Sequence, residues 1–192
     1  MNPCKIKQRP TFSEERKFLA GGYRLTAGVD EVGRGCLAGP VVACAVILPC
    51  NIRPPWLKQV RDSKMLTREK REYLFRYIEE SAISVGTGVV DNILIDSLGV
   101  GNASKLAMKI AIEELVPTAD SLLIDFFTLH EVKLPQKGII DGDALCNSIA
   151  CASVIAKDTC DLMMLELDQQ YPGHGLLNHK GYGTREHWHC IE

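Results

Sequence analysis

The longest uninterrupted apolar run of the chain, residues 41–48, most constrains how the chain can fold. Eight apolar residues suit a buried β-strand and are too few to span a membrane. Residues 23–30 predict a strand just before this run, and a short glycine-rich segment connects the two. Strands joined so closely pair antiparallel. The sequence therefore predicts two neighbouring strands in the core of a sheet.

The rest of the sequence alternates between predicted helices and strands. A first helix is expected to begin at the N-cap Ser13 and to end at Gly21-Gly22. Further helices are expected after the N-cap Thr67, over residues 102–115, over residues 148–167, and after the N-cap Thr184. Strands are expected over 83–90, broken by Gly86 and Gly88, over 122–125 and within 134–140, with a loop over 171–182. This order predicts one α/β domain with a mixed sheet covered by helices.

Composition excludes few functional classes. The 192 residues suffice for one domain with a real core, and a formal net charge of -2 neither demands nor excludes nucleic acid. A slightly acidic enzyme can still carry a local basic groove. Residues 1–5 lack an apolar signal core, so we expect a cytoplasmic protein that does not bind membranes.

The eight cysteines form no C-x-x-C pair, which favours a reducing compartment over a disulfide framework. Four of them lie in apolar or small-residue surroundings and are expected to act as small buried hydrophobes: Cys44, Cys146, Cys151 and Cys160.

Acidic residues follow several predicted strands. Asp30, Glu31, Asp125 and Asp143 stand at or just after strand ends, so their loops can meet at one edge of the sheet. Carboxylates suit Mg²⁺ or Mn²⁺, and two such ions can serve phosphoryl transfer. Each acid alone is better explained by a structural or solvated position, and it is the repeated placement of an acid after an apolar strand that brings the metal interpretation level with this alternative. Because neighbouring strand residues point to opposite faces, Asp30 and Glu31 share a site only if the strand ends between them or Glu31 contributes its carbonyl.

Basic and aromatic residues near glycines suggest contact with a phosphate or sugar. Gly33 and Gly35 expose backbone N–H groups around Arg34, in a pattern that matches neither a P-loop nor a dinucleotide-binding turn. Tyr182, between two glycines, can lie against a sugar or base, or simply pack its loop. Three lysines could steady a phosphate or be solvated: Lys64, Lys157 and Lys180.

Two further groups have a structural and a functional interpretation. Asp161 is expected at a helix surface or as the support of a lysine. His187, His189 and Cys190 lack the spacing of a structural zinc site, so a scattered loop and surface group is expected.

Six motifs resemble, in order and spacing, those of bacterial ribonuclease HII. They occupy residues 27–35, 62–64, 123–125, 142–143, 148–157 and 179–184. The resemblance implies a ribonuclease H-like α/β fold, with a catalytic domain over 23–192, a helical extension over 1–22, and a C-terminus shorter than in relatives.

The resemblance also implies an endonuclease that cuts the RNA strand of RNA–DNA hybrids and the 5′ side of single ribonucleotides in duplex DNA, leaving 3′-hydroxyl and 5′-phosphate ends. It assigns two Mn²⁺ or Mg²⁺ ions to Asp30, Glu31, Asp125 and Asp143. It assigns recognition of the ribose 2′-OH to Gly33, Arg34, Gly35 and Tyr182, and a phosphate contact to Lys64. We expect a monomer whose partner is the nucleic acid.

The chain departs from the family pattern at several positions. Phe126 replaces a usual glycine, Asp141 a usual lysine and Gly99 a usual asparagine, while Ser104 keeps a hydroxyl. Two alternatives therefore stay open: a hybrid-binding protein without turnover, and a metal nuclease for another structured nucleic acid. Metal-dependent cleavage separates the first from the enzyme, and a substrate panel separates the second.

Overall fold

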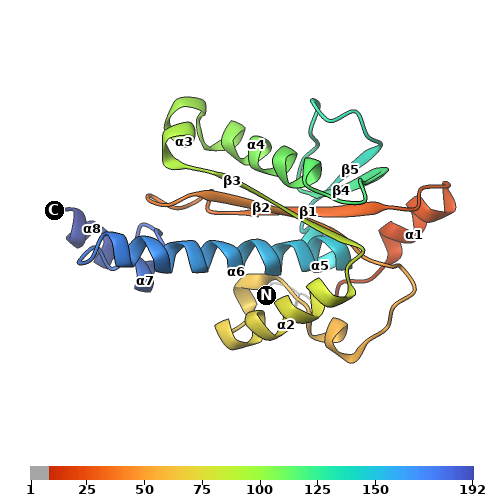
Figure 1. Ribbon diagram of the computed structural model, residues 1–192, viewed down its shortest axis with the longest axis horizontal. Helices are drawn as coiled ribbons and strands as arrows, with labels where there is room; N and C mark the ends of the chain where they lie inside the picture. Colours follow the sequence, from red (N-terminus) through yellow and green to blue (C-terminus); the bar gives the residue numbers. More distant parts are fainter. Residues whose placement is uncertain (1–8) are drawn as a thin grey trace, which may run out of the picture.

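The computed structural model describes residues 9–192 and contains one five-stranded sheet between two layers of helices (Figure 1). Cys4 and residues 1–8 of the expected extension lie outside the described residues. The elements are, in order, α1 (Ser13–Ala20), β1 (Thr26–Val32), β2 (Val41–Ile47), η1 (Pro55–Gln59), η2 (Ser63–Met65), α2 (Arg68–Ser81), β3 (Ser84–Val90), α3 (Asn92–Leu98), α4 (Val100–Glu113), β4 (Ser121–Asp125), β5 (Gln136–Ile139), α5 (Gly142–Leu145), α6 (Asn147–Gln170), α7 (Leu176–His179) and α8 (Arg185–Ile191).

The sheet is mixed, as the sequence predicts. Its strand order is β3-β2-β1-β4-β5. β1 pairs antiparallel with β2, and β2 antiparallel with β3. β4 runs parallel to both β1 and β5. The predicted antiparallel pairing of the first two strands is therefore confirmed, and β1 and β4 place their carboxyl ends at the same edge.

Helices cover both faces of the sheet (Figure 1). On one face, Ala27 and Val29 of β1 share a buried cluster with Ala107 and Met108 of α4. On the other face, residues of β2 pack with α6 and α2. The β2 strand is buried along its whole length, which explains why its sequence is apolar without alternation.

Glycines allow both helical layers to lie unusually close to the sheet. A Cβ atom at Gly28 would lie 2.2 Å from the carbonyl carbon of Ser148 in α6. Cβ atoms at Gly86 and Gly88 would lie 2.1 and 2.0 Å from carbonyl oxygens of α4. The expectation that these two glycines break β3 was wrong, because both pair with β2 and serve helix packing instead.

Several predicted boundaries differ from the structure. The first strand runs from Thr26 to Val32 rather than over 23–30, because the Asp120 carboxylate accepts the N–H groups of Arg24 and Leu25. The N-cap of α1 is Phe12 rather than Ser13. The predicted loop over 171–182 contains the short helix α7.

Other predictions at helix ends are confirmed. Thr67 caps α2 and Thr184 caps α8 through their side chains. The predicted long helix is α6. The cysteines expected to be buried, Cys44, Cys146, Cys151 and Cys160, are buried and free. From residue 9 onward, no helix is both long enough and apolar enough to cross a membrane.

Candidate active site

Three acids lie near the carboxyl ends of β1 and β4. β1 pairs with β4 only as far as Val29, so Asp30 follows the point where the two strands separate. Asp125 is the last residue of β4, and its Oδ1 accepts the Gly142 N–H at 2.7 Å. This bond draws the turn before Asp143 against the strand end. Asp143 itself lies in the short helix α5, not directly after β5.

Glu31 leaves the sheet on the other face. β1 continues to Val32, and Glu31 pairs with Ala43, so the strand does not end between Asp30 and Glu31. Their side chains therefore start from opposite faces. The Glu31 N–H donates to Asp30 Oδ1 at 2.8 Å, and the Glu31 carboxylate lies 3.5 Å from the Arg34 guanidinium.

Burial raises the pKa of all four carboxyl groups. Burial has the largest effect on Asp30, and the nearby Glu31 and Asp125 charges raise its pKa further. For Glu31, burial and the Asp125 charge outweigh Arg34, which lowers the pKa. Burial, with the charges of Asp62 and Asp125, raises the pKa of Asp143 to about 6. Burial likewise raises the pKa of Asp125, although the Lys64 charge lowers it. The site thus holds an excess of negative charge.

These four carboxylates suit a hard divalent cation, because such ions prefer oxygen ligands and would reduce the repulsion that raises the pKa values. Within residues 9–192, no three acidic, histidine or cysteine side chains lie close enough together to hold a metal ion as they stand. The donor chemistry therefore fits, and the side chains would have to turn toward one another to share an ion.

The predicted turn at 33–35 lies beside the loop that carries Tyr182. Cys36 and Tyr182 form an antiparallel bridge, and the Leu37 N–H donates to the Gly181 carbonyl at 2.8 Å. Gly33 has φ 97°, and a Cβ there would lie 2.3 Å from the Pro40 carbonyl oxygen, so the turn requires glycine. Gly35 has open space around it, which leaves the backbone accessible to a ligand.

The predicted lysines also face this region. Lys157 Nζ lies 5.6 Å from the centre of the Tyr182 ring and 2.7 Å from Asp161 Oδ1. Asp161 is only 8% exposed, so the interpretation as support for a lysine is confirmed and the surface interpretation was wrong. Lys180 is half-buried in the same loop.

Lys64 is exposed in η2, which hydrogen bonds hold in place. The Asp62 carboxylate accepts the Lys64 N–H at 2.9 Å, and the hydroxyls of Ser63 and Ser153 lie 2.9 Å apart. Because Ser153 also lowers the pKa of Asp30 by a hydrogen bond, α6 connects the Lys64 segment to the acids.

Two sets of side-chain contacts that hold the Lys64 segment and the Tyr182 loop in place were not predicted from the sequence. Arg71 bonds Asp161 at 2.6 Å and the Leu66 carbonyl at 2.8 Å, so it ties α6 to the segment that follows Lys64. His179 and His187 stack beneath the Tyr182 loop. Neither pair has a recognisable spacing, because the partners come from segments that only the tertiary fold brings together.

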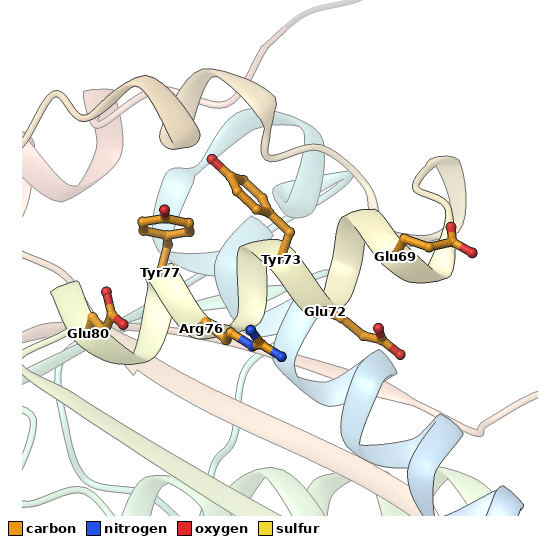
Figure 2. Close-up of a pocket in the computed structure, with 6 residues that line it drawn as sticks. All are labelled: Glu69, Glu72, Tyr73, Arg76, Tyr77 and Glu80. Carbon is orange, nitrogen blue, oxygen red and sulfur yellow. The ribbon is translucent and has the colours of Figure 1, made fainter.

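A separate hollow of about 420 Å³ lies along the outer side of α2 (Figure 2). Tyr73 and Tyr77 stand next to each other in it, with ring centroids 4.8 Å apart, and Arg76 points away from them. Its acids are Glu69, Glu72 and Glu80. Three carboxylates disfavour a phosphate ligand, and none of the predicted site residues lines this hollow.

Comparison with known sequences finds one family. The family model described as Ribonuclease HII matches residues 27–191. A Ribonuclease HII from Dehalococcoides mccartyi is 56% identical over 182 residues, which cover 95% of this chain and 86% of that protein.

Comparison with solved structures supports the fold. The crystal structure of ribonuclease H2 from Pyrococcus horikoshii OT3 aligns with a TM-score of 0.70 and 25% identity, covering 84% of this chain and 82% of the other. Bst-RNase HIII in complex with Mn²⁺ aligns with a TM-score of 0.60 and 21% identity, covering 76% of this chain and 55% of the other. The second likeness concerns the fold alone. The expected ribonuclease H-like mixed sheet is therefore confirmed.

Proposed function

The chain belongs to the ribonuclease HII family and is a hydrolytic endoribonuclease of the ribonuclease H type, and from this we propose that it cuts the RNA strand of RNA–DNA hybrids. We extend the proposal to cleavage on the 5′ side of single ribonucleotides in duplex DNA, leaving 3′-hydroxyl and 5′-phosphate ends. The single observation that carries it is the group of acids at the shared carboxyl edge of β1 and β4.

Asp30, Glu31, Asp125 and Asp143 are proposed to hold two Mg²⁺ or Mn²⁺ ions. Support comes from their mutually raised pKa values and from the Mn²⁺ complex of the RNase HIII neighbour. When bound, divalent cations polarise the attacking water and neutralise the charge of the phosphate. The protein contributes the fixed positions: the Gly142 N–H orients Asp125, and the Glu31 N–H orients Asp30.

Recognition of the ribose is proposed for Gly33, Arg34, Gly35 and Tyr182. A 2′-OH distinguishes RNA from DNA and both donates and accepts hydrogen bonds. The open backbone at Gly35 allows close approach, and the bridge between Cys36 and Tyr182 keeps the ring beside the turn. Lys64 is exposed near Asp125 and Asp143, where it can contact a phosphate next to the cut.

The domain division and cellular setting are proposals of the same kind. We assign catalysis to residues 23–192 and treat 1–22 as an extension of a monomeric, cytoplasmic enzyme. Within the described part of that extension, Glu15 of α1 accepts the Ser148 N–H and hydroxyl at 3.0 and 2.8 Å, so α1 supports the start of α6.

The test is cleavage of a labelled DNA duplex that contains one ribonucleotide, with Mg²⁺, with Mn²⁺ and with chelator, beside Asp125→Asn. A metal-dependent cut directly 5′ of the ribonucleotide, absent in the variant, is expected. Binding without a cut would establish the non-catalytic alternative. A panel of substrates tests the remaining alternative. If the protein cleaves another structured nucleic acid in preference to both the RNA–DNA hybrid and the duplex with one ribonucleotide, it is a metal nuclease for that other substrate.

A further inference from the structure

A basic groove of about 260 Å³ lies where the segment before α1, residues 52–60 and the start of α6 come together. Its charged lining residues are Arg9, Arg16, Arg53 and Lys58, and no acid lines it. It contrasts with the hollow on α2, where three glutamates gather (Figure 2).

The charges of this groove are not neutralised within residues 9–192. None of its four basic side chains forms an ion pair or donates a side-chain hydrogen bond there, although the chain has a formal net charge of -2. All four are exposed. Unpaired cations concentrated in one concavity attract an anion and strengthen one another's potential.

An amide adds a second polar group to the groove. Asn147 lines the groove and is 5% exposed as a residue, and its side chain makes no hydrogen bond within residues 9–192. Its amide atoms are not among the fully buried atoms that lack a partner, which are Glu15 Oε2 and Arg71 Nε, so the amide is free to bind a ligand that enters the groove. Asn147 also opens the 24-residue helix α6, whose N-terminus carries a partial positive charge. The groove therefore combines four full charges, a free amide and a helix end.

The groove lies next to the candidate active site along two chain segments. Asn147 comes four residues after Asp143, and Val60, also in its lining, comes four residues before Lys64. Thr11 of the groove bridges Cys146, which fixes the segment before α1 against the α5–α6 junction. Of the cations in the groove, Lys58 comes six residues before Lys64, and six residues reach at most ~22 Å. One phosphate per ~3.4 Å of each strand makes this roughly six nucleotides of duplex.

We infer that this groove binds backbone phosphates of the duplex flanking the cut, with Lys58 about six nucleotides or fewer from the phosphate that Lys64 meets. The inference rests on the proposed function for its substrate and goes beyond it by adding a second contact surface. A chain of phosphates suits four separated cations, since each side chain can take its own anion. The contact supplies affinity and does not read sequence.

The test is binding of a 25-base-pair duplex with one ribonucleotide, measured by fluorescence anisotropy in chelator over a range of salt concentrations. For Arg53→Ala/Lys58→Ala, the slope of log K against log salt should fall by about 2, and affinity at low salt by about tenfold, if each residue contacts one phosphate. Arg76→Ala, in the acidic hollow, is the matched control and should keep the wild-type slope.

Shortened substrates locate the contact. Two shortened duplexes are compared, each trimmed to two base pairs on one side of the ribonucleotide. With one of them, the wild-type protein should show the reduced slope of log K against log salt that the double variant shows on the long duplex. With the other, it should keep the full slope. Equal slopes for wild type and double variant on the long duplex would overturn the inference. A second result would also overturn it: an oligoglutamate peptide binds the groove, and the double variant keeps its full affinity for the duplex. That result would indicate an acidic protein partner.

Cleavage in Mg²⁺ separates failure of this inference from failure of the proposed function. If wild type binds with the expected slope but does not cut, the function fails and the groove stands. If wild type cuts and the double variant binds equally well, only the groove fails.

Discussion

The imidazole rings of His179 and His187 stack with centroids 3.9 Å apart and planes 13° from parallel. Both rings are buried, and both hold the loop of Tyr182. The Gly181 N–H donates to His179 Nδ1 at 3.2 Å, and His187 Nδ1 lies 3.0 Å from the Tyr182 carbonyl oxygen. Because His179 Nε2 faces the His174 carbonyl at 2.8 Å, the two contacts of His179 require the neutral ring with its proton on Nε2.

Replacing His187 should therefore weaken selectivity without removing an acid. We expect His187→Ala to lower the preference for ribonucleotide over deoxyribonucleotide substrate by about fivefold to tenfold, since one hydrogen bond of about 1 kcal/mol orients the loop. His189→Ala removes an exposed histidine two residues later and should keep the preference. The measurement is the ratio of kcat/KM for the two substrates. Equal ratios in all three proteins would refute the role of the stack.

Asp161→Asn should destabilise the fold strongly. Asp161 bonds Arg71 and Lys157, and all three side chains are nearly buried. Removing one charge of a buried group leaves the others uncompensated, at a cost of about 3–5 kcal/mol. Denaturant unfolding measures the change. Glu72→Gln, which breaks the exposed pair with Arg68, is the comparison and should have little effect; similar losses in both variants would contradict the prediction.

Two adjacent glutamates should shape the pH dependence of stability in opposite directions. Burial raises the pKa of Glu15 above 4.5, so the folded state binds this proton more tightly than the unfolded state, and stability falls as pH rises through that range. Hydrogen bonds from Lys137 and Lys17 lower the pKa of Glu14, whose contribution is present at higher pH and lost as pH falls through its folded pKa.

Glu15→Gln should therefore gain stability relative to wild type as pH rises, and Glu14→Gln should lose it. Urea unfolding between about pH 3 and 8 gives the two difference curves, with the shared background of the other acids cancelled. Curves of the same sign would show that the two environments are assigned wrongly.

Phe126→Gly should stabilise the protein slightly. Phe126 has φ 67°, in the left-handed region, and the residue is 63% exposed. Release of this backbone strain should raise the free energy of unfolding by about 1–2 kcal/mol. The greater entropy of a glycine in the unfolded chain should lower it by about 0.5–1 kcal/mol. Phe127→Gly, with no such strain and a ring packed against the core, should instead destabilise. Thermal unfolding decides, and a loss of stability in Phe126→Gly would rule out strain.

Local patterns in the sequence were enough to predict the layers of the fold. The apolar run at β2 and the acids near the carboxyl ends of β1 and β4 predicted the mixed sheet and its candidate edge, because buried strands and strand ends each favour particular residue types. Phe126 has left-handed geometry at a position where the resemblance led us to expect a glycine, although strain was not inferred from the sequence.

The sequence could not indicate most side-chain contacts between segments that are distant in the chain. Gly86 and Gly88 suggest a broken strand until α4 is known to lie against them. Likewise, Arg71 and Asp161 are 90 residues apart, and His179 pairs with His187 only because α7 and α8 fold back on one another. Such contacts depend on tertiary geometry rather than on residue type.

The tie between the turn after β1 and the Tyr182 loop also has a consequence for synthesis of the chain. Cys36 Sγ donates to the Lys180 carbonyl, a partner 144 residues later in the sequence. At ~5–20 residues per second, the ribosome makes that partner about 7 to 30 s after the turn. During this interval the nascent chain already contains Asp30 and Glu31 but not the loop that holds Tyr182. The contact between the turn and the Tyr182 loop therefore forms only near the end of synthesis, and the recognition surface proposed above is completed last.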